Sequence, residues 1–164
     1  MGRNVAALAL PEGLVFAGEK DTKRLLERSG NVLDGTEVGL VTSQAEDEHW
    51  FLVFEWDDVG YVKDDEKDAI DADALLQSIR EATEESNEER TKQGGGALRV
   101  VGWSVPPHYD PVSHSLVWAV VAKDDQGDQV VNYNVRVLGR AGVMSVTLVD
   151  DPASAVPHGP CIAL

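Results

Sequence analysis

The sequence predicts an α+β fold in which one largely antiparallel sheet, of roughly six to nine strands, packs against two helices. The long acidic helix is expected at about 73–93 and the short helix at about 21–29. Two observations lead to this class. Four apolar segments after residue 97 are joined by short loops, and the apolar periodicity becomes helical between about 73 and 93. A chain of 164 residues suits a single domain, predicted at 1–150, with a loose tail at 151–164.

The first predicted elements are short. Val5–Leu10 and Leu14–Ala17 flank Pro11 and predict two short strands or one hairpin. Asp21 is a suitable N-cap for the short helix, Leu25 and Leu26 supply its apolar stripe, and Gly30 follows it as a C′ glycine. Glu37–Thr42 is then expected to form a strand after the Asp34-Gly35 turn.

His49–Trp56 predicts a central strand. Trp50, Leu52, Phe54 and Trp56 fall on one face at period two, with Phe51 and Val53 on the other. Apolar residues on both faces are typical of a strand that is covered on both sides.

The long helix is predicted from a stripe at three- and four-residue spacing. The stripe contains Leu75, Leu76, Ile79, Ala82 and Ser86, and we expect it to pack on the sheet while the helix carboxylates face solvent. Gly94-Gly95-Gly96 then ends the helix.

Four strands should follow as an antiparallel meander, because their connections are too short for a crossover helix. They are expected at Leu98–Val105, His114–Lys123, Val130–Leu138 and Val143–Val149. In the third of these, Val131, Tyr133, Val135 and Val137 alternate with Asn132, Asn134 and Arg136, which predicts one dry and one polar face.

Composition excludes several classes of protein. Hydrophobic residues make up 43% and charged residues 26%, which excludes wholesale disorder. The single cysteine, Cys161, cannot form an internal disulfide and has only His158 near it in sequence. No apolar run approaches the roughly 18 residues of a membrane span, so we expect this chain itself to carry no export signal or anchor.

The net charge of −15 is local, since residues 46–89 hold 17 acids against three bases. Such a segment repels phosphate backbones and anionic membranes, so no nucleic-acid partner is expected. Within it, the run Asp64–Asp68 does not match an EF-hand loop: Ala69 occupies the turn position that needs glycine, and Leu75 the position that needs a bidentate glutamate. A solvated turn ahead of a helix N-terminus is the preferred interpretation.

His108, Asp110 and His114 form the one constellation that could hold a zinc-like ion, as a metal-assisted hydrolase would require. The alternative is a proline-rich turn between strands, with Asp110 capping it, and we expect no cofactor. Nucleophile elbow, Walker and dinucleotide-binding motifs are all absent, and the four tryptophans in predicted strands are expected in the core. The sequence therefore favours a protein that is not an enzyme.

Several motifs in order are similar to one known family. They are Gly60-Tyr-Val-Lys-Asp-Asp65 with the acidic helix after it, Val101-Gly-Trp103, Pro106-Pro-His-Tyr-Asp110, His114 with Leu116 and Trp118-Ala119, and Asn132-Tyr-Asn134 with Arg136-Val-Leu-Gly-Arg140. Over roughly residues 5–150 the chain resembles the uncharacterised membrane-anchored bacterial proteins grouped as domain of unknown function 2167. The resemblance implies a domain held outside the cytoplasm, in proteins with an export signal and a membrane anchor that this chain does not show. It supplies no activity, cofactor or catalytic residue.

Together these observations predict a non-catalytic, extracytoplasmic module that binds an unknown protein or envelope component. Its binding surface is expected to join a loop at His108–Asp110 to a polar strand face. The candidate residues are Trp103, His108, Tyr109, Asp110, Asn132, Asn134 and Arg136. Tyr109 would be an exposed aromatic anchor and Arg136 a bidentate donor to a carboxylate. An apolar patch left uncovered on the sheet would favour self-association.

Overall fold

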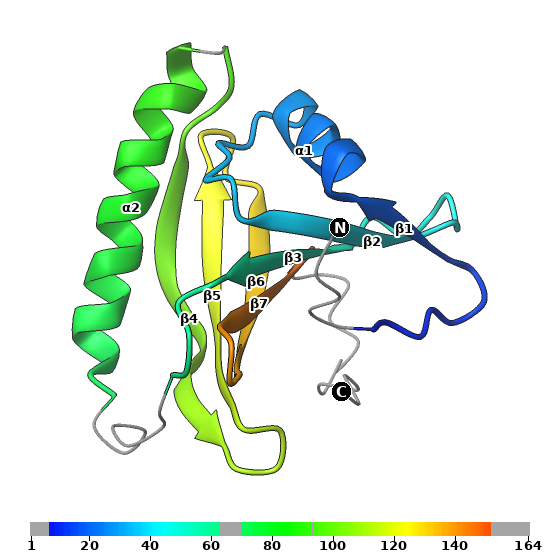
Figure 1. The fold of residues 1–164 in the computed structure, drawn as a ribbon. Helices are drawn as coiled ribbons and strands as arrows, with labels where there is room; N and C mark the ends of the chain where they lie inside the picture. The colour runs from blue at the N-terminus through cyan, green and yellow to red at the C-terminus, as the bar shows by residue number, and fades with distance from the viewer. Residues whose placement is uncertain (1–6, 63–69, 93, 152–164) are drawn as a thin grey trace.

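A computed structural model describes residues 7–62, 70–92 and 94–151 of the chain. In this part of the chain seven strands form one antiparallel sheet with the order β1-β2-β3-β7-β6-β5-β4, and two helices accompany it (Figure 1). The elements are β1 (Leu14–Gly18), α1 (Glu19–Arg28), β2 (Glu37–Ser43), β3 (Phe51–Asp57), α2 (Ala72–Lys92), β4 (Leu98–Asp110), β5 (Ser115–Asp124), β6 (Gln129–Leu138) and β7 (Val143–Asp150). The predicted α+β class with one antiparallel sheet and two helices is confirmed.

The last four strands form the predicted meander, and β7 then pairs with β3 to join the two halves of the sheet. Every pair of neighbours is antiparallel, so β3 and β4 run in the same direction although three strands separate them. Helix α2 connects these two strands and therefore crosses one face of the sheet, a connection the sequence did not predict.

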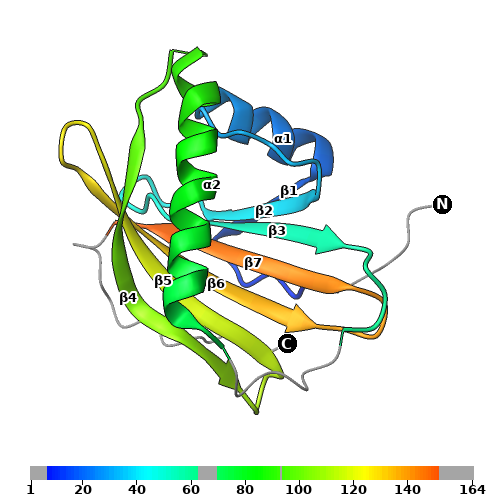
Figure 2. The same ribbon diagram turned by 90° about the vertical axis from the view of Figure 1, so that its left-hand side faces the viewer.

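Both helices lie on the same side of the twisted sheet (Figures 1 and 2). Helix α1 packs over β1 and β2, where Leu26 meets Leu40 and Val53 in a buried cluster. Helix α2 packs along the edge strand β4. We call this side the helix face and the opposite side the apolar face. Residues that are directly opposed in an antiparallel register share a face. The strand pairings therefore show whether each strand side chain lies on the helix face or on the apolar face.

Helix α1 begins two residues earlier than predicted, and its N-cap is Gly18, not Asp21. Asp21 instead lies in the first turn, where the helix dipole favours a negative charge. The predicted C′ glycine is confirmed, because Gly30 has a φ of 75° and donates to the Glu27 carbonyl while Asn31 donates to that of Leu26. Of the two stripe leucines, Leu26 is buried and Leu25 is exposed.

Helix α2 starts after Asp71, whose Oδ1 accepts the N–H of Ala74 at 2.9 Å, as an N-cap does. The glycine terminator is also confirmed, since Gly94 has a φ of 81° and Gly95 donates to the Arg90 carbonyl at 2.8 Å. The predicted apolar stripe is only partly correct. Its leucines and Ile79 are half-buried, Ala82 is exposed, and the buried residue of the helix is Asn87.

Asn87 attaches α2 to the edge of the sheet. Its Nδ2 donates to the Leu98 carbonyl at 2.7 Å, and its Oδ1 accepts the Leu98 N–H at 2.8 Å. Arg80 adds a bond from its guanidinium to the Val101 carbonyl at 3.3 Å. The helix therefore satisfies backbone groups of β4 that face away from β5, which protects one edge of the sheet from pairing with another strand.

Two predicted local structures are wrong. Residues 7–10 form no strand, so the hairpin predicted before β1 does not exist in the described part of the chain. The segment predicted as a loop at Pro106–Asp110 belongs to β4. Proline is tolerated there because β4 is an edge strand whose register with β5 shifts between Val105 and His108. The loose tail predicted at 151–164 lies outside the described residues, apart from Asp151.

Candidate functional site

The predicted binding residues do not all share one face of the sheet. Across β4, β5 and β6, Tyr109 is in register with Arg136 through Leu116, and Trp103 with Asn132 through Val120. These four residues and Asn134 therefore lie on the helix face. His108 and Asp110 are in register with Val135 and Val137, so they belong to the apolar face. The structure thus brings together Trp103, Tyr109, Asn132, Asn134 and Arg136, and it separates His108 and Asp110 from them.

Arg136 is held in place by an aromatic ring. Its guanidinium carbon lies 5.3 Å from the centroid of the Trp118 ring, and Trp118 itself is only 5% exposed. The arginine side chain is exposed, and within the described part of the chain no carboxylate lies within 4.0 Å of it. A guanidinium placed on a buried tryptophan keeps its donors available and loses less freedom when a ligand binds.

The two asparagines of β6 form a short polar network next to this arginine. Asn134 donates to the carbonyl of Asn132 at 3.0 Å and accepts a hydrogen bond from the Thr147 hydroxyl at 3.2 Å. The Oδ1 of Asn132 is buried and has no hydrogen-bond partner among the described residues. An acceptor left unpaired costs free energy unless it finds a donor, so the network has spare accepting capacity.

At the end of β4, each predicted metal ligand has a partner of its own. His108 Nδ1 lies 3.1 Å from the Pro106 carbonyl, and His114 Nδ1 lies 3.1 Å from the Tyr109 hydroxyl. Asp110 accepts from the Ser113 hydroxyl and from the Val112 N–H, and these bonds hold the pKa of its carboxyl below the ordinary value. The two histidines and Asp110 do not meet: among the described residues they form no group of ligand atoms within 4.8 Å of one another.

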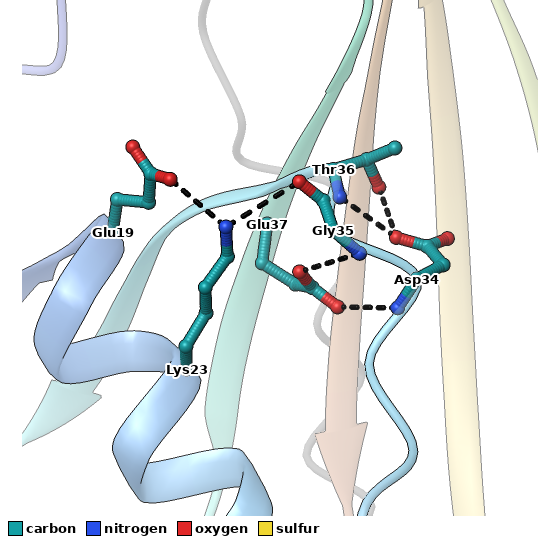
Figure 3. A network of polar contacts seen from close by, with 6 residues as sticks. All are labelled: Glu19, Lys23, Asp34, Gly35, Thr36 and Glu37. Carbon is teal, nitrogen blue, oxygen red and sulfur yellow. Dashed lines mark hydrogen bonds and ion pairs between the residues drawn. The ribbon is translucent and has the colours of Figure 1, made fainter.

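Three other residues do bring possible metal ligands together. Carboxylate oxygens of Asp34, Glu37 and Glu55 lie within 4.8 Å of one another on the helix face. Both oxygens of Glu37, which is 3% exposed, are occupied: they accept the N–H groups of Asp34 and Gly35 (Figure 3). Asp34 in turn accepts the N–H and the hydroxyl of Thr36. These hydrogen bonds fix the turn before β2. As metal ligands, carboxylate oxygens such as these would suit only hard cations.

Lys23 places a positive charge beside this turn. Its Nζ lies 2.8 Å from a Glu19 carboxylate oxygen and 3.4 Å from the Gly35 carbonyl (Figure 3). Glu55 pairs directly with Glu37 across β2 and β3, and like charges in such a pair repel each other. Burial is the main cause that raises the pKa of Glu55 to about 7, Asp34 and Glu37 raise it further, and Arg136 opposes the shift. The cluster therefore keeps a proton on Glu55 at mildly acidic pH.

Sequence reasoning missed this cluster, although one signal was available. Glu55 is the only charged residue in the run Phe51–Trp56, which is otherwise entirely apolar. A carboxylate at that position of a central strand requires a polar neighbour on an adjacent strand. The neighbours became known only with the register of β2 against β3.

Comparison with known proteins places the chain in a family. Residues 1–160 match the family described as protein of unknown function (DUF2167). The chain belongs to the DUF2167 family. No curated protein matches the chain. No solved structure matches it. The DUF2167 assignment agrees with the motifs noted in the sequence, and it carries no activity with it.

Two features considered in the sequence analysis remain. Within the described residues, no helix combines the length and apolar character needed to cross a membrane. The acidic run Asp64–Asp68 and the residues His158 and Cys161 lie outside the described residues.

Proposed function

We propose that this DUF2167 chain is a non-catalytic binding module of a membrane-anchored bacterial protein and acts outside the cytoplasm. The proposed binding surface lies on the helix face of β4 and β6 and is formed by Trp103, Tyr109, Asn132, Asn134 and Arg136. The observation that carries the proposal is the exposed guanidinium of Arg136, fixed on the buried Trp118 ring with no carboxylate partner among the described residues.

The surroundings of Arg136 indicate the chemistry of the ligand. A planar guanidinium binds a carboxylate through two parallel hydrogen bonds. A partner with many negative charges is disfavoured, because the chain carries a net charge of −15. The surface therefore fits a weakly charged protein or envelope component that presents one carboxylate next to an apolar group for Tyr109.

Pull-downs from envelope extracts test the surface. The variant combines Tyr109→Ala with Arg136→Ala, which removes the aromatic anchor and the guanidinium. A matched control combines His108→Ala with Arg140→Ala, because both residues are exposed and neither lies among the residues of the proposed surface. We expect the first variant to lose partners that the wild type and the control retain. Identical partners for all three proteins would remove this surface from consideration.

The proposed location has a separate test. The membrane-anchored parent protein should be digested by a protease added to spheroplasts, because the domain would face away from the cytoplasm. Digestion only after the cells are lysed would contradict an extracytoplasmic location and would leave the binding surface unaffected.

A further inference from the structure

The two edges of the sheet differ in how they are protected. β4 forms one edge, where helix α2 covers outer backbone groups, two prolines interrupt the strand and the register with β5 shifts three times. β1 forms the other edge, and its sequence Leu-Val-Phe-Ala-Gly contains no proline and no charged residue (Figure 1). Its register with β2 is regular throughout. Native proteins usually block a sheet edge with charges, proline or bulges, so the edge at β1 is open to a further strand.

The hydrogen bonds to β2 show which backbone groups of β1 point outward. Gln44 donates its N–H to the Gly13 carbonyl at 2.9 Å, so Gly13 faces β2. In an antiparallel ladder the backbone groups of successive residues point alternately to the two sides of the strand. Val15 and Ala17 therefore also pair with β2, whereas the N–H and the carbonyl of Phe16 point away from the sheet.

The free groups of this edge form a short set. The N–H of Leu14 donates to the Pro11 carbonyl at 3.4 Å. Gly18 is the N-cap of α1, so its carbonyl accepts the first hydrogen bond of that helix. The edge therefore offers, in order, the Leu14 carbonyl, both groups of Phe16 and the Gly18 N–H. Within residues 7–62, 70–92 and 94–151 these four groups have no backbone partner.

A second copy of the same strand supplies the matching groups. When two copies of β1 run antiparallel about a twofold axis at Phe16, the two Phe16 residues exchange both N–H···O bonds. The Gly18 N–H of each copy then donates to the Leu14 carbonyl of the other. All four free groups are paired, and none is left over on either copy. Such a self-complementary patch is what a twofold dimer interface requires.

The side chains of β1 also suit this pairing. Phe16 is 48% exposed and Val15 is 42% exposed, and they lie on opposite faces of the sheet. Phe16 belongs to the apolar face, because it is in register with Val41, and through Val41 with Leu52. The pairing places the two Phe16 rings opposite each other, and aromatic cross-strand pairs are stabilising. On the helix face it places Val15 of each copy opposite Ala17 of the other.

The charge at this end of the molecule permits a second copy to approach. The net charge of −15 comes mainly from residues 46–89. Residues 7–45, which include β1, hold six acids and four bases and so carry a net charge of only −2. Repulsion between two copies is therefore weaker at β1 than where two of the acidic segments would meet.

We propose that the free edge of β1 pairs with β1 of a second copy of this chain and joins two seven-stranded sheets into one. The contact is small, since it involves the five residues Leu14–Gly18 of each chain, so the dimer is weak and forms at high protein concentration. This inference does not depend on the proposed function, because no residue of the proposed binding surface lies on β1.

Two charged variants of Phe16 test the pairing and its register. In sedimentation equilibrium of the full-length chain between about 5 and 500 µM, the wild-type mass should rise from 17.7 kDa toward twice that value. Phe16→Lys and Phe16→Glu should each remain monomeric, because like charges would directly oppose each other across the axis. An equimolar mixture of the two variants should associate again, because the opposed charges then attract.

The matched control is Val101→Lys, because Val101 is 50% exposed but lies on the other edge strand, β4. This variant should dimerise as the wild type does. A wild-type chain that is still monomeric at about 500 µM would overturn the proposal. Association that persists in both Phe16 variants would assign the contact to another surface, and a mixture that stays monomeric would contradict the twofold register at Phe16. Either result would also overturn it.

Amide hydrogen exchange of the wild-type chain adds a measurement that needs no substitution. The Phe16 and Gly18 amides should exchange more slowly as the protein concentration rises, because they become hydrogen-bonded only in the dimer. The Val15 and Ala17 amides, which already face β2, should exchange at a rate that does not depend on concentration. Slow exchange of Phe16 at the lowest concentration would show that another part of the same chain pairs with β1, and would overturn the proposal.

Discussion

The two sides of strand β6 show how differently this protein uses the faces of its sheet. Val131, Tyr133, Val135 and Val137 point to the apolar face, and Asn132, Asn134 and Arg136 point to the helix face. The helices would be expected to cover the more apolar of two faces. They cover the more polar one instead. The helix positions are therefore determined by local contacts at the two edges of the sheet, and not by the average polarity of a face.

The two helices illustrate this point. Helix α1 is held by apolar contacts, with Leu26 buried against Leu40 and Val53. Helix α2 has no buried apolar side chain among its described residues and is attached to β4 through Asn87. Strand β6 lies between the strands on which the two helices pack, and its helix face carries Asn132, Asn134 and Arg136 of the proposed surface.

Removal of the Asn87 side chain should have the largest effect on the helix face. Asn87→Ala leaves the N–H and the carbonyl of Leu98 without their partners, and each unpaired group costs about 1–3 kcal/mol. We expect the free energy of unfolding in urea to fall by about 2–4 kcal/mol. Glu88→Ala, at the exposed neighbouring position, should change it by less than about 0.5 kcal/mol. Equal effects would show that Asn87 does not attach the helix.

A pair of isosteric substitutions compares the two faces directly. Val146→Thr places a hydroxyl on the buried centre of the apolar face, and an unpaired hydroxyl there should cost about 1–3 kcal/mol. Thr147→Val, one residue along on the helix face, removes only the hydrogen bond to Asn134, worth about 0.5–1.5 kcal/mol net, and gains apolar surface. Thermal unfolding of both variants should show the larger loss for Val146→Thr. A larger loss for Thr147→Val would reverse the assignment of the faces.

The smallest effect concerns Glu55 and depends on pH. Its pKa is raised from 4.5 to about 7 in the folded protein, so the folded state retains a proton that the unfolded state has already lost between these values. Stability therefore falls as the pH rises from about 4.5 to 7, and the penalty is complete above that window. Glu55→Gln should raise the free energy of unfolding at pH 8 by about 1–2 kcal/mol, after allowance for solvent screening.

The control for this prediction is the same variant at low pH. At pH 4 the wild-type carboxyl is protonated in both states, so Glu55→Gln should leave the stability nearly unchanged. A substitution that stabilises the protein equally at both pH values would act through packing and would contradict the role of the carboxylate cluster.

Local sequence patterns predicted most of the elements, because periodicity and terminating residues act over short distances. Gly30 and Gly94 ended the helices as expected, and strict alternation identified β6. The segment Pro106–Asp110 was predicted as a loop because proline usually breaks strands. It belongs to β4 because that strand is at the edge of the sheet, and the position of a strand in a sheet depends on pairings that are distant in sequence.

The candidate site was predictable only in part, for the same reason. Alternation in β6 placed Asn132, Asn134 and Arg136 on one face, and the structure confirms that they share it. The partner of Arg136, Trp118, could not be identified without the register of β5 against β6. The separation of His108 from Tyr109 follows from their adjacent positions in an extended strand, which a predicted loop conceals.

The exposure of the two faces to a soluble, neutral paramagnetic probe tests the difference between them most directly. In the full-length protein, the probe should broaden signals of the Arg136 side chain on the helix face. The methyl signals of Val131 and Val146 should be protected, because only 5% and 2% of these residues are exposed. Strong broadening of these two methyl signals, with Arg136 protected, would contradict our assignment of one face to internal packing and the other to recognition.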